Sequence, residues 1–222
     1  MTRPVELALP FQGTWLVRNS PARRVPSHGT DLFATTYAID FVAVRGRRTA
    51  AVRDWRTALG TEPPERFVAF GRPVLAPAAG TVVAGAPRAP APPARRARAG
   101  GGGGGRAAAA RGARGAAALA GNHVVLALDP PGTYVVLAHL RAGSVAVEPG
   151  RRVAAGDELG RCGSSGNSTQ PHVHVQAMDA PDALAARGLP LVFRGFRERS
   201  RDGSSRVVDL GVPAEGAVVE PA

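Results

Sequence analysis

Short runs of apolar and β-branched residues, separated by turn-forming residues, recur along most of the chain. Such runs are typical of strands, in which successive side chains point to opposite faces of a sheet. We expect strands over Gly13–Val17, Tyr37–Val44, Gly80–Ala84, His123–Leu128 and Thr133–Leu140. Only Arg45–Leu59 and Asp182–Arg187 have a helical pattern, and both are short. The pattern therefore predicts an all-β fold, a mostly antiparallel β-sheet core with few short helices.

Turn-forming residues separate these predicted strands and indicate how some of them are connected. The sequence Asp129-Pro130-Pro131-Gly132 separates two of the runs, which predicts a β-hairpin. Glu148–Gly150 and Ala155–Asp157 are further turn signals. The C-terminal residues 212–222 carry two small valine patches. They either close the sheet or form a flexible tail.

Residues 86–118 differ in composition from the rest of the chain. They consist of Ala, Pro and Arg, then six consecutive glycines, then Ala, Arg and Gly. Such a segment cannot bury enough apolar surface to offset the entropy of ordering. We predict a disordered insertion within one domain that spans residues 1–222. It would join the strand near Val82 to the strand that starts at His123.

Composition narrows the classes of function. Hydrophobic residues make up 44% of the 222 residues, enough for a real core. The net charge is +11, and all 28 basic residues are arginine. Residues 86–118 contain seven arginines and no acid, so they supply +7 of this charge. The remaining +4 is spread over the rest of the chain, which argues against a specific nucleic-acid-binding face.

Cysteine content and hydropathy exclude other classes. Cys162 is the only cysteine, so neither an intramolecular disulfide nor a multi-cysteine zinc site can form. No stretch reaches the roughly 20 apolar residues of a membrane span. Met1–Phe11 is not a convincing signal peptide, because its short apolar run is interrupted by Glu6. The sequence thus shows no export signal and leaves the localisation open.

The segment Pro171–Val175 is the most informative one for chemistry. In a strand, His172 and His174 would point to the same face, while Val173 and Val175 would face the core. Neutral imidazole is a common metal ligand and a common general base. The pair therefore indicates either a metal site or a strand with two half-exposed histidines.

Three more residues are candidates for the same site. His28 lies in a loop context, and His139 ends a predicted strand. Asp40 lies between Ile39 and Phe41, where a carboxylate is costly to bury unless it is paired or coordinated. Asp40 and His139 also have a purely structural interpretation. Asp40 would then pair with an arginine, and His139 would be a hydrogen-bonded histidine at a sheet edge. Gly163–Thr169 either supplies backbone donors near a metal or forms a turn that positions the next strand.

At these residues the chain resembles the lysostaphin-type (LytM-like) zinc metallopeptidases, which cut peptidoglycan peptides. The resemblance rests on Ala138-His139-Leu140 and on the run of glycines from Gly150 through Gly156, Gly160, Gly163 and Gly166 to Pro171-His172-Val173-His174. It extends from about Gly121 to Met178. It implies a small antiparallel sheet with a groove between loops, a zinc cofactor, and a bacterial cell-wall peptide as substrate.

The resemblance also implies roles for individual residues. Zinc would be bound by His28, Asp40 and His174, and the zinc-bound water would be flanked by the catalytic residues His139 and His172. The first part of the motif departs from the usual pattern, because eleven residues separate His28 from Asp40. Asp31 is closer to His28 but lies in a polar loop. We prefer Asp40 and expect His123 to be structural or to line a groove.

Other functions remain open alongside this one. The run Val147–Gly160 also resembles the hairpin of biotinyl and lipoyl carrier domains, but these carriers need an acceptor lysine and the chain has none. A non-catalytic relative that binds wall peptide or activates another hydrolase is one alternative. A zinc hydrolase that acts on a different substrate is another. A monomer is favoured, although the sequence does not fix the oligomeric state.

Overall fold

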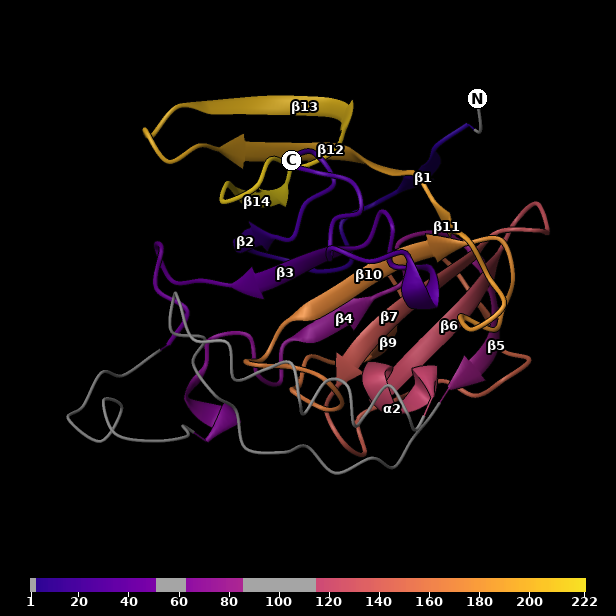
Figure 1. Cartoon of the computed structure of the whole chain (residues 1–222). Helices are drawn as coiled ribbons and strands as arrows, with labels where there is room; N and C mark the ends of the chain where they lie inside the picture. Colours follow the sequence, from indigo (N-terminus) through magenta and orange to yellow (C-terminus); the bar gives the residue numbers. More distant parts are fainter. Residues whose placement is uncertain (1–2, 51–62, 86–114) are drawn as a thin grey trace.

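The computed structural model of the chain describes residues 3–50, 63–85 and 115–222 (Figure 1). These residues form mostly β-sheet, which confirms the predicted fold class. Helical structure in the described ranges consists of three short pieces: the α-helix α2 (Ala116–Ala120) and the 3₁₀ turns η1 (Leu32–Ala34) and η3 (Pro64–Arg66). The fold is therefore set by strand pairing.

Most strands join one twelve-stranded sheet. Its order is β1-β12-β14-β2-β3-β10-β7-β6-β5-β8, with β11 beside β10 and β13 beside β12, while β4 and β9 form a separate pair. Neighbouring strands are antiparallel except β1 and β12. The strands are β1 (Val5–Leu7), β2 (Trp15–Arg18), β3 (Ile39–Ala43), β4 (Pro73–Leu75), β5 (Gly80–Gly85), β6 (Asn122–Leu128), β7 (Tyr134–Leu140), β8 (Arg152–Val153), β9 (Glu158–Arg161), β10 (Val173–Met178), β11 (Gly188–Leu189), β12 (Leu191–Arg199), β13 (Ser205–Gly211) and β14 (Val218–Pro221).

Strands β3 and β10 lie in the middle of the sheet. Figure 1 shows β12, β13 and β14 at one end of the molecule and β5, β6 and β7 toward the other. Along β10, Val173, Val175 and Ala177 join the main hydrophobic core. The alternate residues of β10 therefore point to the opposite face, and His174 is among them. Because side chains alternate along β10, its polar residues lie on one face of the sheet and its apolar residues pack in the core on the other.

The predicted hairpin and its neighbours are confirmed. β6 and β7 pair through the Asp129–Gly132 turn, and β5 pairs with β6 as its other neighbour. The strand near Val82 thus lies beside the strand that contains His123. The predicted insertion 86–118 falls outside the described residues except for its end, where α2 begins.

Two predicted helices differ from the structure. Asp182–Arg187 forms a single turn, in which the Ala186 amide donates to the Asp182 carbonyl. It continues no further, because the Arg187 amide donates to the Asp179 carboxylate and Gly188 starts β11. Of Arg45–Leu59, the described residues 45–50 form a tight turn closed by Arg45 and Arg48. Residues 51–59 lie outside the described ranges.

The C-terminal segment joins the sheet as β14, between β12 and β2. Val218 and Val219 of β14 pair with β2, and Val218–Pro221 pairs with β12 on the other side. Of the two outcomes that the sequence left open for residues 212–222, the paired strand is the one that the structure has. No helix in the described part of the chain is long and apolar enough to cross a membrane.

Candidate metal centre

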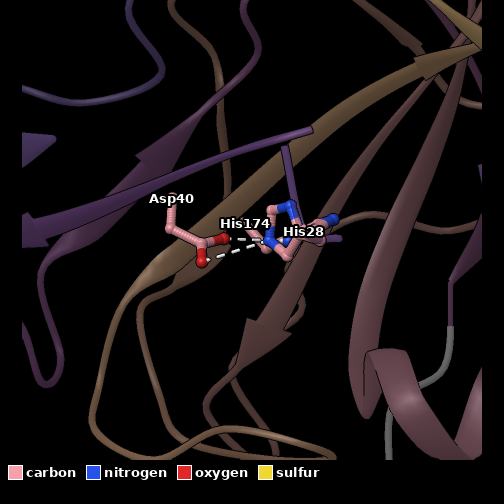
Figure 2. Close-up of side chains that lie close together, drawn as sticks. All are labelled: His28, Asp40 and His174. Carbon is pink, nitrogen blue, oxygen red and sulfur yellow. Dashed lines mark hydrogen bonds and ion pairs between the residues drawn. The ribbon is translucent and has the colours of Figure 1, made fainter. Parts of the chain in front are cut away.

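Three side chains that are distant in sequence converge on one point (Figure 2). His28 comes from the loop before η1, Asp40 from β3 and His174 from β10. Their ligand atoms all lie within 4.8 Å of one another. The His28 Nε2 atom is 3.3 Å from Asp40 Oδ2, and the His174 Nδ1 atom is 2.9 Å from Asp40 Oδ1. The group has the composition of a metal site.

Strand register explains why Asp40 and His174 meet. The two residues are direct partners across the antiparallel pair of β3 and β10. Ile39 and Phe41 on either side of Asp40 are in the main core, as are Val173 and Val175 on either side of His174. Because neighbours along a strand alternate between faces, both polar side chains are directed to the same opposite face.

His28 is held by the hydrogen bonds of its loop. The Ser27 amide donates to the Thr36 carbonyl at 2.9 Å, and the Ser27 hydroxyl donates to the Thr35 carbonyl at 3.2 Å. With its proton engaged in this way, the Ser27 hydroxyl can only accept from the His28 Nδ1–H, which lies 3.0 Å away. The other ring nitrogen, Nε2, therefore faces Asp40.

His139 and His172 lie beside this group. Their ring centroids are 4.5 Å apart, and those of His139 and His174 are 5.8 Å apart. His139 has a φ of 63°, in the left-handed region, and sits near the end of β7. An L-residue in that conformation is strained, and such strain persists only where the surroundings enforce it.

Backbone carbonyls set the orientation of both rings. His139 Nδ1–H donates to the Ser165 carbonyl at 2.8 Å, and His172 Nδ1–H donates to the Gln170 carbonyl at 2.8 Å. A carbonyl oxygen can only accept, so each Nδ1 carries the proton. In both rings Nε2 is left as the free nitrogen, and the His172 Nε2 lies 3.6 Å from Asp40 Oδ1.

Asp40 is ionised at the centre of this cluster. Burial by itself raises its pKa, but the charges of His172 and His28 and the hydrogen bonds from His174 and His28 hold the pKa well below its usual range. Asn19 adds a further hydrogen bond, from its amide to Asp40 Oδ2 at 2.7 Å. The carboxylate is thus available as an anionic ligand across the physiological pH range.

The histidines have different pKa shifts. Burial lowers the pKa of His139 well below its ordinary value, and the neighbouring His172 and His174 lower it further. Burial also lowers the pKa of His172, although Asp40 opposes it. For His174, burial lowers the pKa, but the hydrogen bond and charge of Asp40 outweigh this effect and raise it. His139 and His172 are therefore neutral near pH 7.

The geometry and chemistry of the three converging residues fit zinc. Two imidazoles and one carboxylate are ligands that zinc commonly takes, and a tetrahedral site with bonds of about 2.0–2.1 Å places its ligand atoms about 3.3 Å apart. The contacts of the two Asp40 oxygens, 3.3 Å from Oδ2 to His28 and 2.9 Å from Oδ1 to His174, are near that spacing, and one ligand atom from each of the three residues lies within 4.8 Å of the others. A set of three protein ligands leaves one tetrahedral position for water or substrate.

The structure separates the other candidates from this group. Asp31 is exposed, and its carboxylate accepts a hydrogen bond from the Thr36 hydroxyl at 2.9 Å. His123 is half-buried, and its Nδ1 contacts the Gly121 carbonyl at 2.7 Å. Of the two carboxylates that the sequence offered, Asp40 is the one near the histidines.

Several residues around the site were not singled out from the sequence. They position the ring nitrogens or the carboxylate, and they are Asn19, Ser27, Ser165, Gln170 and Gln176. Gln176 could have been found, because it lies two residues after His174 on the same strand face. The others contact their partners through loop conformations that carry no recognisable sequence signal. Ser165 lies in Gly163–Thr169, the segment that the sequence indicated as a source of backbone donors or a turn, and it contacts His139 through its carbonyl, an acceptor.

One protein-family model matches the central part of the chain. Residues 105–185 match the sequence model of peptidase family M23. This segment is therefore similar to that family, in agreement with the resemblance noted from the sequence. The matched segment contains His139, His172 and His174. His28 and Asp40 precede it, so their place in the site rests on the structure.

Solved structures show weaker likenesses. The catalytic domain of lysostaphin from Staphylococcus simulans has 20% identity, with a TM-score of 0.40 over 68% of this chain and 74% of that chain. Csd3 from Helicobacter pylori has 17% identity and a TM-score of 0.41, over 84% of this chain and 34% of that one. A zinc-containing peptidase from Vibrio cholerae has 20% identity and a TM-score of 0.34, over 69% and 50%. No curated protein sequence matches the chain.

Proposed function

We propose that this protein is a zinc metalloendopeptidase that hydrolyses peptide bonds of bacterial peptidoglycan. One observation carries the proposal: His28, Asp40 and His174 place their ligand atoms within 4.8 Å, beside the paired rings of His139 and His172. The match of residues 105–185 to the family M23 model supports the reaction class and the substrate class. We further propose that residues 1–222 form one peptidase-like β domain, monomeric, with residues 86–118 as an insertion.

In this proposal, His28, Asp40 and His174 hold the metal through Nε2, the carboxylate and Nδ1. Bound zinc supplies a Lewis acid that polarises the scissile carbonyl and lowers the pKa of water toward about 7. The ionised state of Asp40 contributes the negative charge that a divalent cation needs. Its hydrogen bond from Asn19 keeps the carboxylate turned toward the two imidazoles.

His139 and His172 serve the proton transfers. Both are neutral near pH 7, and in both the Nδ1–H is fixed on a backbone carbonyl. Each ring therefore presents an unprotonated Nε2 that can accept a proton from the attacking water and pass it to the leaving amine. In the protonated form the same Nε2–H can donate a hydrogen bond to the developing oxyanion.

The test combines metal analysis with peptide cleavage. Purified wild-type protein should contain close to stoichiometric zinc and should cleave peptidoglycan or peptides that contain glycine and D-alanine. His174→Ala should lose both zinc and cleavage. His139→Gln and His172→Gln should keep zinc and lose cleavage. Stoichiometric zinc in a wild-type protein that cleaves no wall peptide would favour a non-catalytic wall-binding protein instead.

A further inference from the structure

The side chain of Gln176 lies between a proposed metal ligand and a neighbouring loop. Its Oε1 atom is 2.9 Å from His174 Nε2, and its Nε2 atom is 2.9 Å from the Phe33 carbonyl oxygen in η1. Gln176 is buried, with 5% of its surface exposed. A buried amide with both ends paired has a fixed orientation.

The Phe33 carbonyl determines which way the amide points. A backbone carbonyl can only accept, so it must face the NH₂ group of Gln176, and Oε1 must then face His174. Because Oε1 can only accept, His174 Nε2 carries a hydrogen and donates it. The Nε2 lone pair is therefore absent, and only Nδ1, which faces Asp40, is left for a metal.

We propose that Gln176 is a positioning residue that makes Nδ1 the metal-ligating atom of His174. This inference rests on the proposed function, because it concerns the same site. It adds a residue that touches neither metal nor substrate and that acts through the orientation and tautomer of a ligand. The Asp40 Oδ1 contact at 2.9 Å shows that Nδ1 already points toward the proposed carboxylate ligand.

The loop that orients Gln176 is itself held in place. Phe33 and Ala34 have φ angles of 60° and 59°, so the chain turns sharply at the carbonyl that Gln176 contacts. Gly188 in β11 lies against this turn, where an added Cβ would come within 2.7 Å of the Ala34 carbonyl oxygen. The acceptor for Gln176 is thus fixed by packing between η1 and β11.

Two variants separate the two hydrogen bonds of Gln176. Gln176→Leu removes both bonds at similar side-chain size. Gln176→Glu keeps an acceptor for His174 Nε2 but removes the donor to Phe33. A residue that merely bridges β10 to η1 would be impaired equally by both changes. Met178→Leu is the matched control: Met178 is buried on the same strand face, and its replacement removes only the weak contact of the Gln176 Nε2 atom with Met178 Sδ, at 3.7 Å, and leaves the bonds to His174 and Phe33 in place.

The first measurement is zinc affinity by competition with a chromophoric chelator on the full chain. Gln176→Leu should weaken zinc binding about 10–100-fold. Gln176→Glu should recover most of the affinity, and Met178→Leu should bind like the wild type. Equal affinity in Gln176→Leu and wild type would overturn the proposal. Equal losses in Gln176→Leu and Gln176→Glu would also overturn it, since they would indicate a bridging role only.

The second measurement needs no variant and applies even when Gln176→Leu fails to fold. Histidine side-chain ¹⁵N spectra of the wild type should show His174 with a protonated Nε2 without zinc, and with zinc on Nδ1 when loaded. Zinc on Nε2, or an Nε2 without hydrogen, would overturn the inference. A protein that binds zinc in this way but cleaves no wall peptide would contradict the proposed enzymatic function and leave the role of Gln176 intact.

Discussion

Asp40 and His174 are separated by 134 residues in sequence, yet they face each other directly across the β3–β10 ladder, with Oδ1 and Nδ1 2.9 Å apart. Their meeting is a property of strand register. A shift of one residue would turn one of the two side chains toward the core. The apolar residues on either side of each one prevent that shift, because they would have to leave the core.

Replacement of this carboxylate should abolish stoichiometric zinc binding. Asp40→Asn keeps the shape of the side chain but removes its charge. We expect zinc affinity to fall by more than the about 100-fold that loss of a ligand's hydrogen-bond partner costs. The matched control is Asp31→Asn, which changes an exposed carboxylate nearby. Chelator competition on both proteins checks this, and zinc lost only from Asp31→Asn would refute the choice of Asp40.

We expect Asn19 to stabilise the protein through its hydrogen bond to the charged Asp40 carboxylate. Its amide donates to Asp40 Oδ2 at 2.7 Å, and its own φ is 50°. Asn19→Ala removes a hydrogen bond to an ionised carboxylate and places alanine at a positive φ, so we expect a loss of at least about 1.5–3 kcal/mol in the free energy of unfolding. Asn19→Asp replaces the donor with a second carboxylate and should destabilise the zinc-free protein further. Chemical denaturation of both variants measures the difference, and an Asn19→Asp protein as stable as the wild type would contradict the contact.

The zinc-free protein should lose stability as the pH falls below about 6.5. Burial lowers the pKa of His139 well below the ordinary 6.5 and lowers that of His172. The unfolded chain therefore binds protons that the folded chain does not, and each such group contributes a slope of up to about 1.4 kcal/mol per pH unit. His174 acts in the opposite sense: its pKa is raised, so its contribution is present below pH 6.5 and lost as the pH rises through the folded value.

The variant His139→Gln isolates the contribution of His139 to the pH dependence of stability. Removal of this ring should flatten the fall in unfolding free energy between about pH 7 and pH 5 in zinc-free protein. His123→Gln is the control, because that ring lies apart from the four around Asp40. Denaturant titrations at several pH values give the slope directly. An unchanged slope in His139→Gln would show that the ring is not held neutral.

The Gly121–Gly166 contact should be intolerant of side chains. Gly166 has a φ of 70°, and an added Cβ would come within 2.5 Å of the Gly121 amide nitrogen. Gly166→Ala would therefore displace the neighbouring Ser165, whose carbonyl orients His139. We expect a loss well above the about 1–2 kcal/mol of the left-handed conformation alone, together with reduced cleavage.

Gly143→Ala is the control for this backbone change. Gly143 has nearly the same φ, 72°, but no atom within 4 Å of an added Cβ. It should lose only the conformational contribution and keep full activity. Thermal unfolding and peptide cleavage of the two proteins test the difference. Equal effects of the two substitutions would show that the close contact is not needed.

The sequence predicted the part of the fold that depends on local alternation. The strands around Asp40, His123 and His139 were recognisable because apolar residues recur within each run. Strands β12 and β13 were not recognised, since Gly195 and several arginines interrupt their pattern. The helical pattern of Asp182–Arg187 was misleading because the residues that flank it stop a helix after one turn.

The residues of the candidate site could also be predicted only where a local sequence pattern indicates them. The sequence indicated His172 and His174 through their spacing on one strand, and it favoured Asp40 over Asp31 only through the local strand context of Asp40. That choice depends on which strand lies next to β10, and this is a long-range property. The contacts of Asn19 and Gln176 depend on it as well, since each reaches a partner on another element.

The span of 134 residues between Asp40 and His174 also links metal supply to folding. Once the sheet is lost, no local segment of the chain keeps the two side chains together, so zinc at the proposed site would favour the native state almost exclusively. At free zinc about 1,000 times the dissociation constant, this selectivity adds about 4.1 kcal/mol to stability. Chelation would then lower the melting temperature as well as activity, and a cell short of zinc would hold less of this protein.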